Sequence, residues 1–420
     1  MATKYSIPRG TYDILPDISY RRIYVEQMFY KIAATFNFKQ IVTPIFERSD
    51  VFERSVGDTS DIVQKEMYRF TDKKGRKFAL RPEGTASVVR SYVENNLGMA
   101  GGATRLCYSG PMFRYDRPQK GRYRQFYQYG VEYLGSDDPM VDAEIIALGH
   151  RYLTALGLKN FKLEINSIGS ANCAKDYDAA LVDYFTPHLD AMCRDCRQRI
   201  DKNPKRLLDC KVASCKAIAK DAPNMLEYLD DDCKTHFTAV QRYLAQMGIP
   251  FSVNPTIVRG LDYYNKTAFE FIDTNLGAQN TLIGGGRYNG LVAQFGGKDV
   301  PGIGFAGGFE RLMLSMETEG CFFGEEPRPQ IYFVALGNAA KVAAAGILYR
   351  LRSQGISAEY NVEKTSMKAQ MKAADKSGAK GVLILGDDEL KDNVVVLKWL
   401  ETGKQKRIKI DNIAEELHPE

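Results

Sequence analysis

The sequence predicts a mixed α/β protein of the α+β type, in which an antiparallel sheet flanked by helices is followed by a smaller α/β domain. Strand-like runs separated by hairpin-length turns occur at 78–81, 105–115, 125–134 and 161–167. Residues 170–253 then carry apolar residues at helical spacing, which predicts a helical insertion. After the charged, proline-containing linker 325–330, strands alternate with helices. We therefore place one domain at 1–326, with the insertion at about 170–253, and an α/β domain at 327–420.

Composition and charge restrict the classes of protein that the chain can belong to. Its 420 residues are 44% hydrophobic and 26% charged, which is enough to bury the cores of two or three domains and argues against global disorder. The net charge of +5 permits a polyanionic partner without requiring one. The N-terminal segment lacks the apolar core of a signal peptide, and no apolar run approaches the roughly 20 residues of a membrane span. We expect a cytoplasmic protein with no membrane partner, whose eight cysteines are free thiols.

The first elements of the chain are a helix, a strand and a polar turn. Residues 19–36 have an apolar stripe at helical spacing, and FKQIVTPIFE is expected to form a strand that ends near Pro44. RPEGTASVVRSYV then places Glu83, Gly84 and Thr85 in a turn before a helix. Glu83 and Thr85 either hold the ammonium group of a substrate or only cap the helix.

The segment 105–135 is predicted to be two strands joined by a basic loop. From 114 to 124 the chain has five basic residues against the single acid Asp116, namely Arg114, Arg117, Lys120, Arg122 and Arg124. Alternation along the second strand puts one set of side chains on a shared face, consisting of Phe126, Gln128, Gly130, Glu132 and Leu134. An aromatic ring, an amide and a carboxylate beside arginines suit a site for a nucleotide and a small polar cation. The alternative is an ordinary amphipathic hairpin with a solvated turn.

Two later segments add cationic candidates. In IVRGLDYYNKTAFEF, Arg259 ends an apolar strand, where it needs either an anionic ligand or a buried ion pair, and Tyr263 and Tyr264 follow it. GIGFAGG contains G-x-G-x-x-G, but no buried strand precedes it, so we interpret it as a short strand whose glycines let a ligand approach. The helix that begins near Gly308 presents Arg311. If Arg114, Arg259 and Arg311 converge, they form a triphosphate site.

Cysteine and histidine positions bear on metal chemistry. Cys193-x2-Cys196 with Cys210 and Cys215 could form a four-thiolate zinc site, and the alternative is four free cysteines. The four histidines lie in none of the motifs, which argues against a histidine base and against a histidine-ligated catalytic zinc.

Five strings occur together in chain order: TPIFERSDVFERSVGDTSDIVQKEMYRFTD, ALRPEGTA, FRYDRPQKGRYRQFYQYGVE, VRGLDYYN and GIGFAGGFERL. With them the chain closely resembles the class II aminoacyl-tRNA synthetases, and among these the histidyl-tRNA synthetases of bacterial type. The third and last strings match class II motifs 2 and 3, and RGLDYY matches the histidine-specific signature. The resemblance covers essentially the whole chain and implies a class II catalytic domain with a C-terminal anticodon-binding domain.

The resemblance also implies an activity and roles for residues. Such an enzyme activates L-histidine with ATP and Mg²⁺, and transfers it to the 3′-terminal adenosine of tRNA(His). Motif 1 (the helix at 19–36 and the strand through Pro44) implies a homodimer, and Arg114, Arg259 and Arg311 are implied as catalytic. ATP would be bound by Arg114, Phe126, Arg259 and Arg311. Histidine would be bound by Glu83, Gly84, Thr85, Arg114, Gln128, Glu132, Arg259, Tyr263 and Tyr264. The tRNA acceptor stem would be contacted by Arg117, Gln119, Arg122 and Arg124.

One position departs from the family pattern, because GGGRYNGL has Asn289 where this family is expected to have Asp. The main rival function is that of a histidine-sensing regulatory subunit of ATP phosphoribosyltransferase. Such chains lack the anticodon domain and lose the catalytic signatures, whereas this chain keeps Arg114, Arg259, Arg311 and residues 327–420. A synthetase-like domain of a kinase is excluded because the chain has no kinase Gly-rich or catalytic loop.

Overall fold

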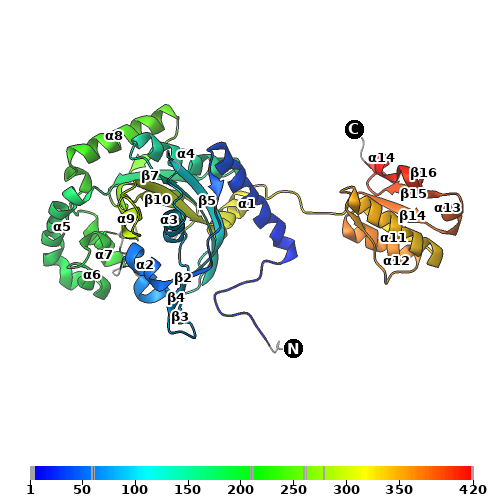
Figure 1. Cartoon of the computed structure of the whole chain (residues 1–420), viewed down its shortest axis with the longest axis horizontal. Coiled ribbons are helices and arrows are strands. Elements are labelled where there is room, and N and C mark those ends of the chain that lie inside the picture. The colour runs from blue at the N-terminus through cyan, green and yellow to red at the C-terminus, as the bar shows by residue number, and fades with distance from the viewer. Residues whose placement is uncertain are drawn as a thin grey trace. The chain divides into compact units, whose positions relative to one another are not determined.

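The structure is a computed structural model that describes residues 5–57, 60, 62–99, 101–208, 210, 212–258, 261, 263–277 and 280–417. The chain divides into two compact units, Met1–Gly324 and Glu325–Glu420 (Figure 1). Arg259 lies outside the described residues. Among the helices of the described part, none is long and apolar enough to cross a membrane.

An eight-stranded sheet, counted over the described residues, forms the centre of the first unit. Its strands are β1 (Lys39–Gln40), β5 (Thr104–Phe113), β6 (Gln125–Leu134), β7 (Phe161–Ser167), β8 (Ser252–Val253), β9 (Asn265–Asp273), β10 (Thr281–Arg287) and β11 (Gly302–Gly308). Their order is β1-β5-β6-β11-β10-β9-β7-β8. The two edge pairs, β1 with β5 and β7 with β8, are parallel, and the pairs between them are antiparallel. The predicted antiparallel sheet flanked by helices is confirmed.

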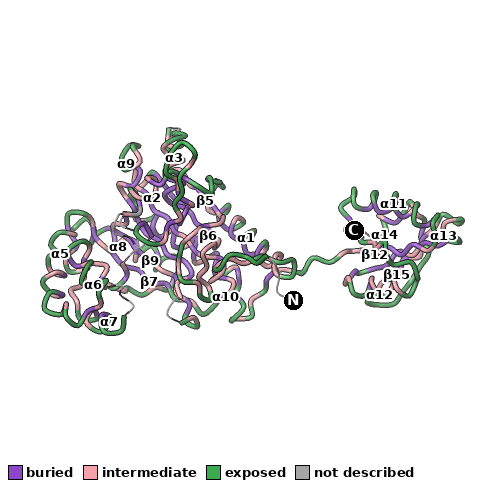
Figure 2. The backbone as a smooth tube through the Cα atoms, turned by 90° about the horizontal axis from the view of Figure 1, so that it is seen from below, coloured by how far each residue is buried: buried purple, intermediate pink, exposed green. Residues whose placement is uncertain are grey.

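One face of this sheet is covered by four helices, which are α1 (Pro16–Thr35), α4 (Pro139–Ala155), α8 (Asp231–Gln246) and α10 (Phe309–Glu319). Their apolar side chains pack on the alternate residues Tyr129, Val131 and Tyr133 of β6. Alpha-helix α4 begins sharply because Pro139 occupies its first turn and Asp138 accepts a hydrogen bond from the Met140 amide at 2.8 Å. Figure 2 shows that the buried residues gather along the strands.

The opposite face carries α3 (Thr85–Glu94) and α9 (Leu291–Gln294), and α2 (Ser49–Val56) packs against α3. Figure 1 shows α2 and α3 on the side of the sheet away from α4 and α8. Leu134 of β6 packs here, with Val89 of α3 and Val292 of α9. The face of β6 that was predicted to carry Phe126, Gln128, Glu132 and Leu134 is therefore the face opposite the main core.

The predicted strand FKQIVTPIFE is wrong in detail, because the chain makes two short strands there. β1 pairs with β5, whereas β2 (Phe46–Arg48) joins a separate antiparallel sheet with β3 (Arg69–Thr71) and β4 (Lys77–Leu80), in the order β2-β4-β3. Pro44 lies between them and has no N–H to donate to a ladder, so the chain changes sheets at this position. The π-helix η1 (Ile62–Glu66) precedes β3.

The insertion is helical as predicted, except that its predicted last residues, Ser252–Val253, form β8 of the large sheet. Its elements are α5 (Ala171–Phe185), η2 (Thr186–Ala191), α6 (Arg194–Arg199), η3 (Pro204–Leu207), α7 (Ala213–Ala219) and η4 (Met225–Glu227), followed by α8. It has its own apolar core, which includes Tyr177, Leu181, Phe185 and Leu207. Alpha-helix α8 instead buries Phe237, Val240 and Leu244 in the main core, so its second half belongs with the large sheet.

The second unit is an α/β domain around a five-stranded sheet, counted over the described residues. Its elements are β12 (Ile331–Ala335), α11 (Asn338–Ser353), β13 (Ala358–Glu359), α12 (Met367–Ser377), β14 (Gly381–Leu385), α13 (Asp387–Lys391), β15 (Val394–Trp399), β16 (Gln405–Lys409), η5 (Ile410–Asn412) and α14 (Ile413–Leu417). The strand order is β13-β12-β14-β15-β16. The pairs among β13, β12 and β14 are parallel, whereas β15 is antiparallel to both β14 and β16.

Candidate active site

The centre of the site is a buried carboxylate on β6. Glu132 is fully buried and accepts hydrogen bonds from Thr85 Oγ1 at 2.7 Å, Tyr288 Oη at 2.6 Å and Tyr108 Oη at 3.3 Å. Burial raises the pKa of Glu132 to about 8, although the bonds from Tyr288 and Thr85 oppose this shift. Burial also raises the pKa values of Tyr108 and Tyr288, so both phenols stay protonated donors.

Glycines on β11 and at the start of α3 make room for this group. A Cβ atom on Gly304 would lie 2.0 Å from Glu132 Oε2, and one on Gly84 would lie 2.2 Å from the Tyr108 ring. Gly307 of the same strand leaves space for Tyr129 in the same way. The sequence interpretation that the glycines of 302–308 let a ligand approach is therefore corrected at Gly304 and Gly307, where side chains of β6 occupy the space, whereas a Cβ on Gly308 would meet no atom within 4 Å.

A second buried carboxylate, that of Glu83, lies just before α3. Glu83 accepts from the backbone amides of Thr85 at 2.6 Å and Ala86 at 2.9 Å, so it does cap this helix. Burial raises its pKa, and these two amide bonds oppose the shift. The Thr85 hydroxyl then donates to Glu132, which connects the two carboxylates. Two buried acids joined through Thr85 suit a small cationic ligand, because a cation would relieve their mutual repulsion.

Further polar and aromatic side chains lie on the same side of the sheet as Glu132. Gln128 lies on the same face of β6 as Glu132, and its buried Oε1 accepts no hydrogen bond from the described residues. Tyr263 and Tyr264 contact each other with ring centroids 4.6 Å apart, and Tyr263 is 5.8 Å from Tyr288. An unpaired buried amide oxygen is costly unless a ligand supplies the donor, which makes Gln128 a natural partner for an ammonium group.

The arginines form a separate, cationic part of the site. Arg114 donates from Nε to the Pro82 carbonyl at 2.8 Å, and its guanidinium lies 5.2 Å from the centre of the Phe126 ring. Arg311, in the first turn of α10, donates to the Thr281 carbonyl at 2.8 Å. Burial lowers the pKa of Arg311 most, and the positive charges of Arg122 and Arg114 lower it further.

This electrostatic repulsion shows that Arg114, Arg122 and Arg311 lie near one another. Of the three arginines predicted to converge, Arg114 and Arg311 do so, and Arg259 lies outside the described residues. Clustered guanidinium groups with lowered pKa values are arranged for an anion with several charges, such as a polyphosphate.

The basic loop between β5 and β6 is folded back on itself. Gln119 and Arg122 exchange backbone hydrogen bonds of 3.0 and 2.9 Å, and Arg117 and Gln119 are exposed. Arg122 forms ion pairs with Asp116 and with Glu66. Arg124 is also engaged, since it lies 4.0 Å from the centre of the Tyr115 ring. The loop thus offers Arg117 and Gln119 to a partner more freely than Arg122 and Arg124.

Comparisons with known proteins identify the family. A family model described as Histidyl-tRNA synthetase matches residues 10–312, and one described as Anticodon binding domain matches residues 330–419. The chain belongs to the histidyl-tRNA synthetase family.

Individual relatives agree over the whole chain. The histidine–tRNA ligase of Acetivibrio thermocellus is 48% identical over 410 residues, which cover 98% of this chain and 98% of that protein. The histidine–tRNA ligase of Bacillus licheniformis is 49% identical over 411 residues, 97% of each chain. The crystal structure of apo S. aureus histidyl-tRNA synthetase matches with a TM-score of 0.84 at 40% identity, and covers 98% of this chain and 99% of that chain.

The structure gives a local reason for Asn289, where this member of the histidyl-tRNA synthetase family departs from the expected Asp. Its Nδ2 donates to Asp137 Oδ1 at 2.8 Å, and its Oδ1 accepts from the Gly302 amide at 3.2 Å. A carboxylate could not make the first of these bonds. Asp137 is also paired with Lys266 at 2.8 Å and Arg287 at 3.3 Å, so negative charge is already present here.

Sequence reasoning missed Tyr108 and Tyr288, the two phenols that donate to Glu132. Tyr108 lies directly opposite Gly130 in the β5–β6 ladder, and Tyr288 follows β10. A tyrosine that faces a glycine across a hairpin is a usable signal, because the glycine leaves space for the ring. No comparable local signal marks Tyr288.

Proposed function

We propose that this chain is a histidine–tRNA ligase, which activates L-histidine with ATP to histidyl-adenylate and transfers the histidyl group to the 3′-terminal adenosine of tRNA(His). The observation that carries this proposal is that buried Glu132 and Gln128, whose Oε1 is unpaired, share one strand face with Phe126, beside Arg114. A pocket for a small cationic amino acid thus adjoins a site for a polyanionic nucleotide.

In the first step, the histidine carboxylate attacks the α-phosphorus of ATP and pyrophosphate leaves. Two anions must approach each other, so preorganised positive charge is the main requirement, and Arg114, Arg259 and Arg311 are proposed to supply it. ATP enters as its magnesium complex, whose ion neutralises charge on the leaving pyrophosphate. The ring of Phe126, beside the Arg114 guanidinium, is proposed to stack on adenine.

Histidine is recognised at both of its ends. Glu83, Thr85 and Gln128 are proposed to hold the α-ammonium, with Gly84 leaving space for the Tyr108 ring beside them. Glu132 and Tyr264 are proposed to bind the two imidazole nitrogens, and Tyr263 to line the pocket. A carboxylate and a phenol at fixed distance form an acceptor–donor pair. Such a pair rejects amino acids that lack the ring nitrogens by about 10⁴-fold.

In the second step, the ribose hydroxyl of the terminal adenosine attacks the adenylate carbonyl, and AMP leaves. We infer that a phosphate oxygen of the adenylate accepts the hydroxyl proton, since the described pocket offers no histidine for this role. Single-turnover transfer in Glu83→Gln and Gln128→Ala should then remain in proportion to their adenylation. A variant that adenylates normally but fails to transfer would overturn this inference.

The partners follow from the same assignment. Arg117, Gln119, Arg122 and Arg124 are proposed to meet the acceptor stem, and the domain at 327–420 to read the anticodon. A homodimer is supported by an exposed aromatic cluster beside motif 1, because Phe46 is 53% and Phe70 44% exposed, and each contacts Phe78. Since ribosomes use charged tRNA in the cytoplasm, we place the protein there.

The decisive experiment is amino-acid-dependent ATP–pyrophosphate exchange with each of the twenty amino acids and no tRNA. Exchange with histidine alone is the expected result. Measurable histidine binding with no exchange for any amino acid would instead favour the regulatory subunit of ATP phosphoribosyltransferase.

A further inference from the structure

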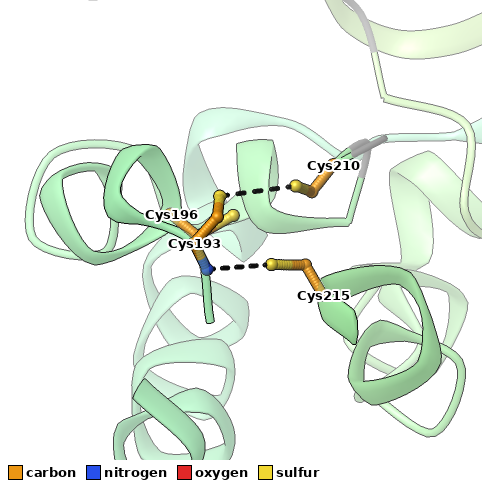
Figure 3. A group of neighbouring side chains, drawn as sticks. All are labelled: Cys193, Cys196, Cys210 and Cys215. Carbon is orange, nitrogen blue, oxygen red and sulfur yellow. Dashed lines mark hydrogen bonds between the residues drawn. The ribbon is translucent and has the colours of Figure 1, made fainter. Parts of the chain in front are cut away.

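Four cysteine side chains of the insertion face one another (Figure 3). Cys193 and Cys196 flank the start of α6, Cys210 follows η3, and Cys215 lies in α7. Their four sulfur atoms all lie within 4.8 Å of one another, and three of the four residues are buried. Two cysteines at the start of α6, one after η3 and one in α7 therefore meet at a single point.

The distances fit one metal ion better than they fit sulfur–sulfur bonds. Cys193 Sγ and Cys210 Sγ are 3.8 Å apart, whereas a disulfide needs about 2.05 Å. Four thiolates at about 2.3 Å from a tetrahedral zinc ion lie about 3.8 Å from one another. An iron–sulfur cluster spreads its cysteines over several iron atoms and so holds them farther apart.

Two further features favour thiolates over neutral thiols at this point. The Cys193 amide donates to Cys215 Sγ at 3.2 Å, and such a bond stabilises a metal-bound thiolate. Four thiolates and one zinc ion carry a net charge of −2, which needs nearby cations. The segment 194–206 between the ligands supplies an excess of cations, with six basic residues against two acids.

A second sulfur-containing group in the insertion shows what an ordinary capping arrangement looks like. Cys173, Asp230 and Cys233 also lie close together. Here Asp230 caps α8 by accepting from the Cys233 amide at 2.8 Å, and Cys173 Sγ accepts from the Ser170 amide at 3.1 Å. These hydrogen bonds at helix starts explain why Cys173, Asp230 and Cys233 lie together. They do not account for four cysteines from three elements.

We propose that Cys193, Cys196, Cys210 and Cys215 bind one zinc ion through four thiolates, and that this structural site holds α6, η3 and α7 together. The three elements have six, four and seven residues. Helices this short are not stable alone, so a metal cross-link contributes directly to their folding.

The first test is metal analysis of the full-length protein, purified without chelator. One equivalent of zinc per chain is expected, and loss of zinc in Cys193→Ser and Cys210→Ser. Cys321→Ser is the matched control, because Cys321 is partly exposed like Cys193 but lies outside the cluster, and it should keep its zinc. Zinc near zero in the wild-type protein, or zinc retained in a Cys193→Ser/Cys210→Ser double variant, would overturn the proposal. Iron at the same stoichiometry would overturn the choice of metal.

A second measurement keeps the proposal testable if the serine variants fail to fold. Wild-type protein exchanged with Co²⁺ should show the intense visible absorption of a tetrahedral cobalt–thiolate centre, and stoichiometric zinc should abolish it. Weak octahedral absorption would contradict a four-thiolate site. Chelator should also make the wild-type chain sensitive to protease between 190 and 220, and zinc should reverse this. Unchanged protection after complete zinc removal would contradict the structural role. Each of these readouts is independent of aminoacylation, so the zinc site and the proposed function can fail separately.

Discussion

Replacing Glu132 with Gln should lower activity and raise stability at the same time. The carboxyl group has an ordinary pKa of 4.5 in the unfolded chain and a pKa of about 8 in the folded protein. The folded state therefore binds a proton that the unfolded state has released, and stability falls as pH rises from about 4.5 to about 8. Glu132→Gln removes this penalty, because an amide does not titrate.

The size of the effect follows from these two values. Each pH unit between them costs about 1.4 kcal/mol, so the limit is about 5 kcal/mol at pH 8. The amide has only one acceptor oxygen, so the variant loses at least one hydrogen bond from its neighbours. This loss offsets the gain in stability by about 1 kcal/mol or more. We expect the variant to match the wild type at pH 5 and to exceed it by about 2–4 kcal/mol at pH 8. For a unit of this size, that corresponds to about 3–6 °C in the melting midpoint.

Calorimetry at pH 5, 6.5 and 8 measures this difference, and the chain has a built-in control. The single tryptophan, Trp399, lies in the second unit, so its fluorescence follows a transition that should not respond to the substitution. In exchange assays, kcat/KM for histidine should fall about 10- to 150-fold, which is the effect of losing a charged hydrogen bond worth about 1.5–3 kcal/mol. A stability difference that is the same at pH 5 and pH 8 would refute the reasoning, because Glu132 would then titrate normally.

Three further substitutions test other parts of the structure. Arg114→Lys should lower kcat for exchange by about 10²–10³-fold, because an ammonium cannot reproduce the fixed guanidinium geometry, and near-normal exchange would count against its role. Asp142→Asn should destabilise the first unit by about 3–5 kcal/mol in urea unfolding. The substitution removes the carboxylate that lies 2.5 Å from the fully buried Arg287 guanidinium. A loss of stability below about 1 kcal/mol would contradict a buried ion pair. Asn289→Asp should cost about 1–2 kcal/mol of thermal stability, because it sets a second carboxylate against Asp137. The rate of ATP–pyrophosphate exchange should change less than about threefold. A gain in stability would show that the Asn289 amide does not stabilise this contact.

Much of the site could be predicted from short stretches of sequence. Period-two alternation along 125–134 is a local property of a strand, so it placed Gln128 and Glu132 on one face before any partner strand was known. The strings around Glu83, Arg114 and Arg311 likewise indicated an anion site next to a polar pocket. The alternation of strands and helices after the linker likewise predicted a C-terminal α/β domain, which lies in the unit Glu325–Glu420.

Other features depended on contacts between distant segments. The prediction of one strand over 38–47 failed because this stretch contributes to two sheets, and Pro44 lies between the two short strands. The roles of Gly304 and Gly84 could not be assigned from sequence, since the side chains that fill the space beside them come from β6 and β5.

The sequence by itself determined the family, the alternating face of β6 and the first pair of cysteines, because each can be recognised from short motifs whose residues are close together in the chain. Only the tertiary structure decided that Tyr108, Tyr288 and Thr85 donate to one carboxylate, and that Cys210 and Cys215 join Cys193 and Cys196. Both groupings depend on strand register and on the packing of separate elements. Burial sums over all of these contacts, so the raised pKa of Glu132 is a property of the folded chain and of no single segment.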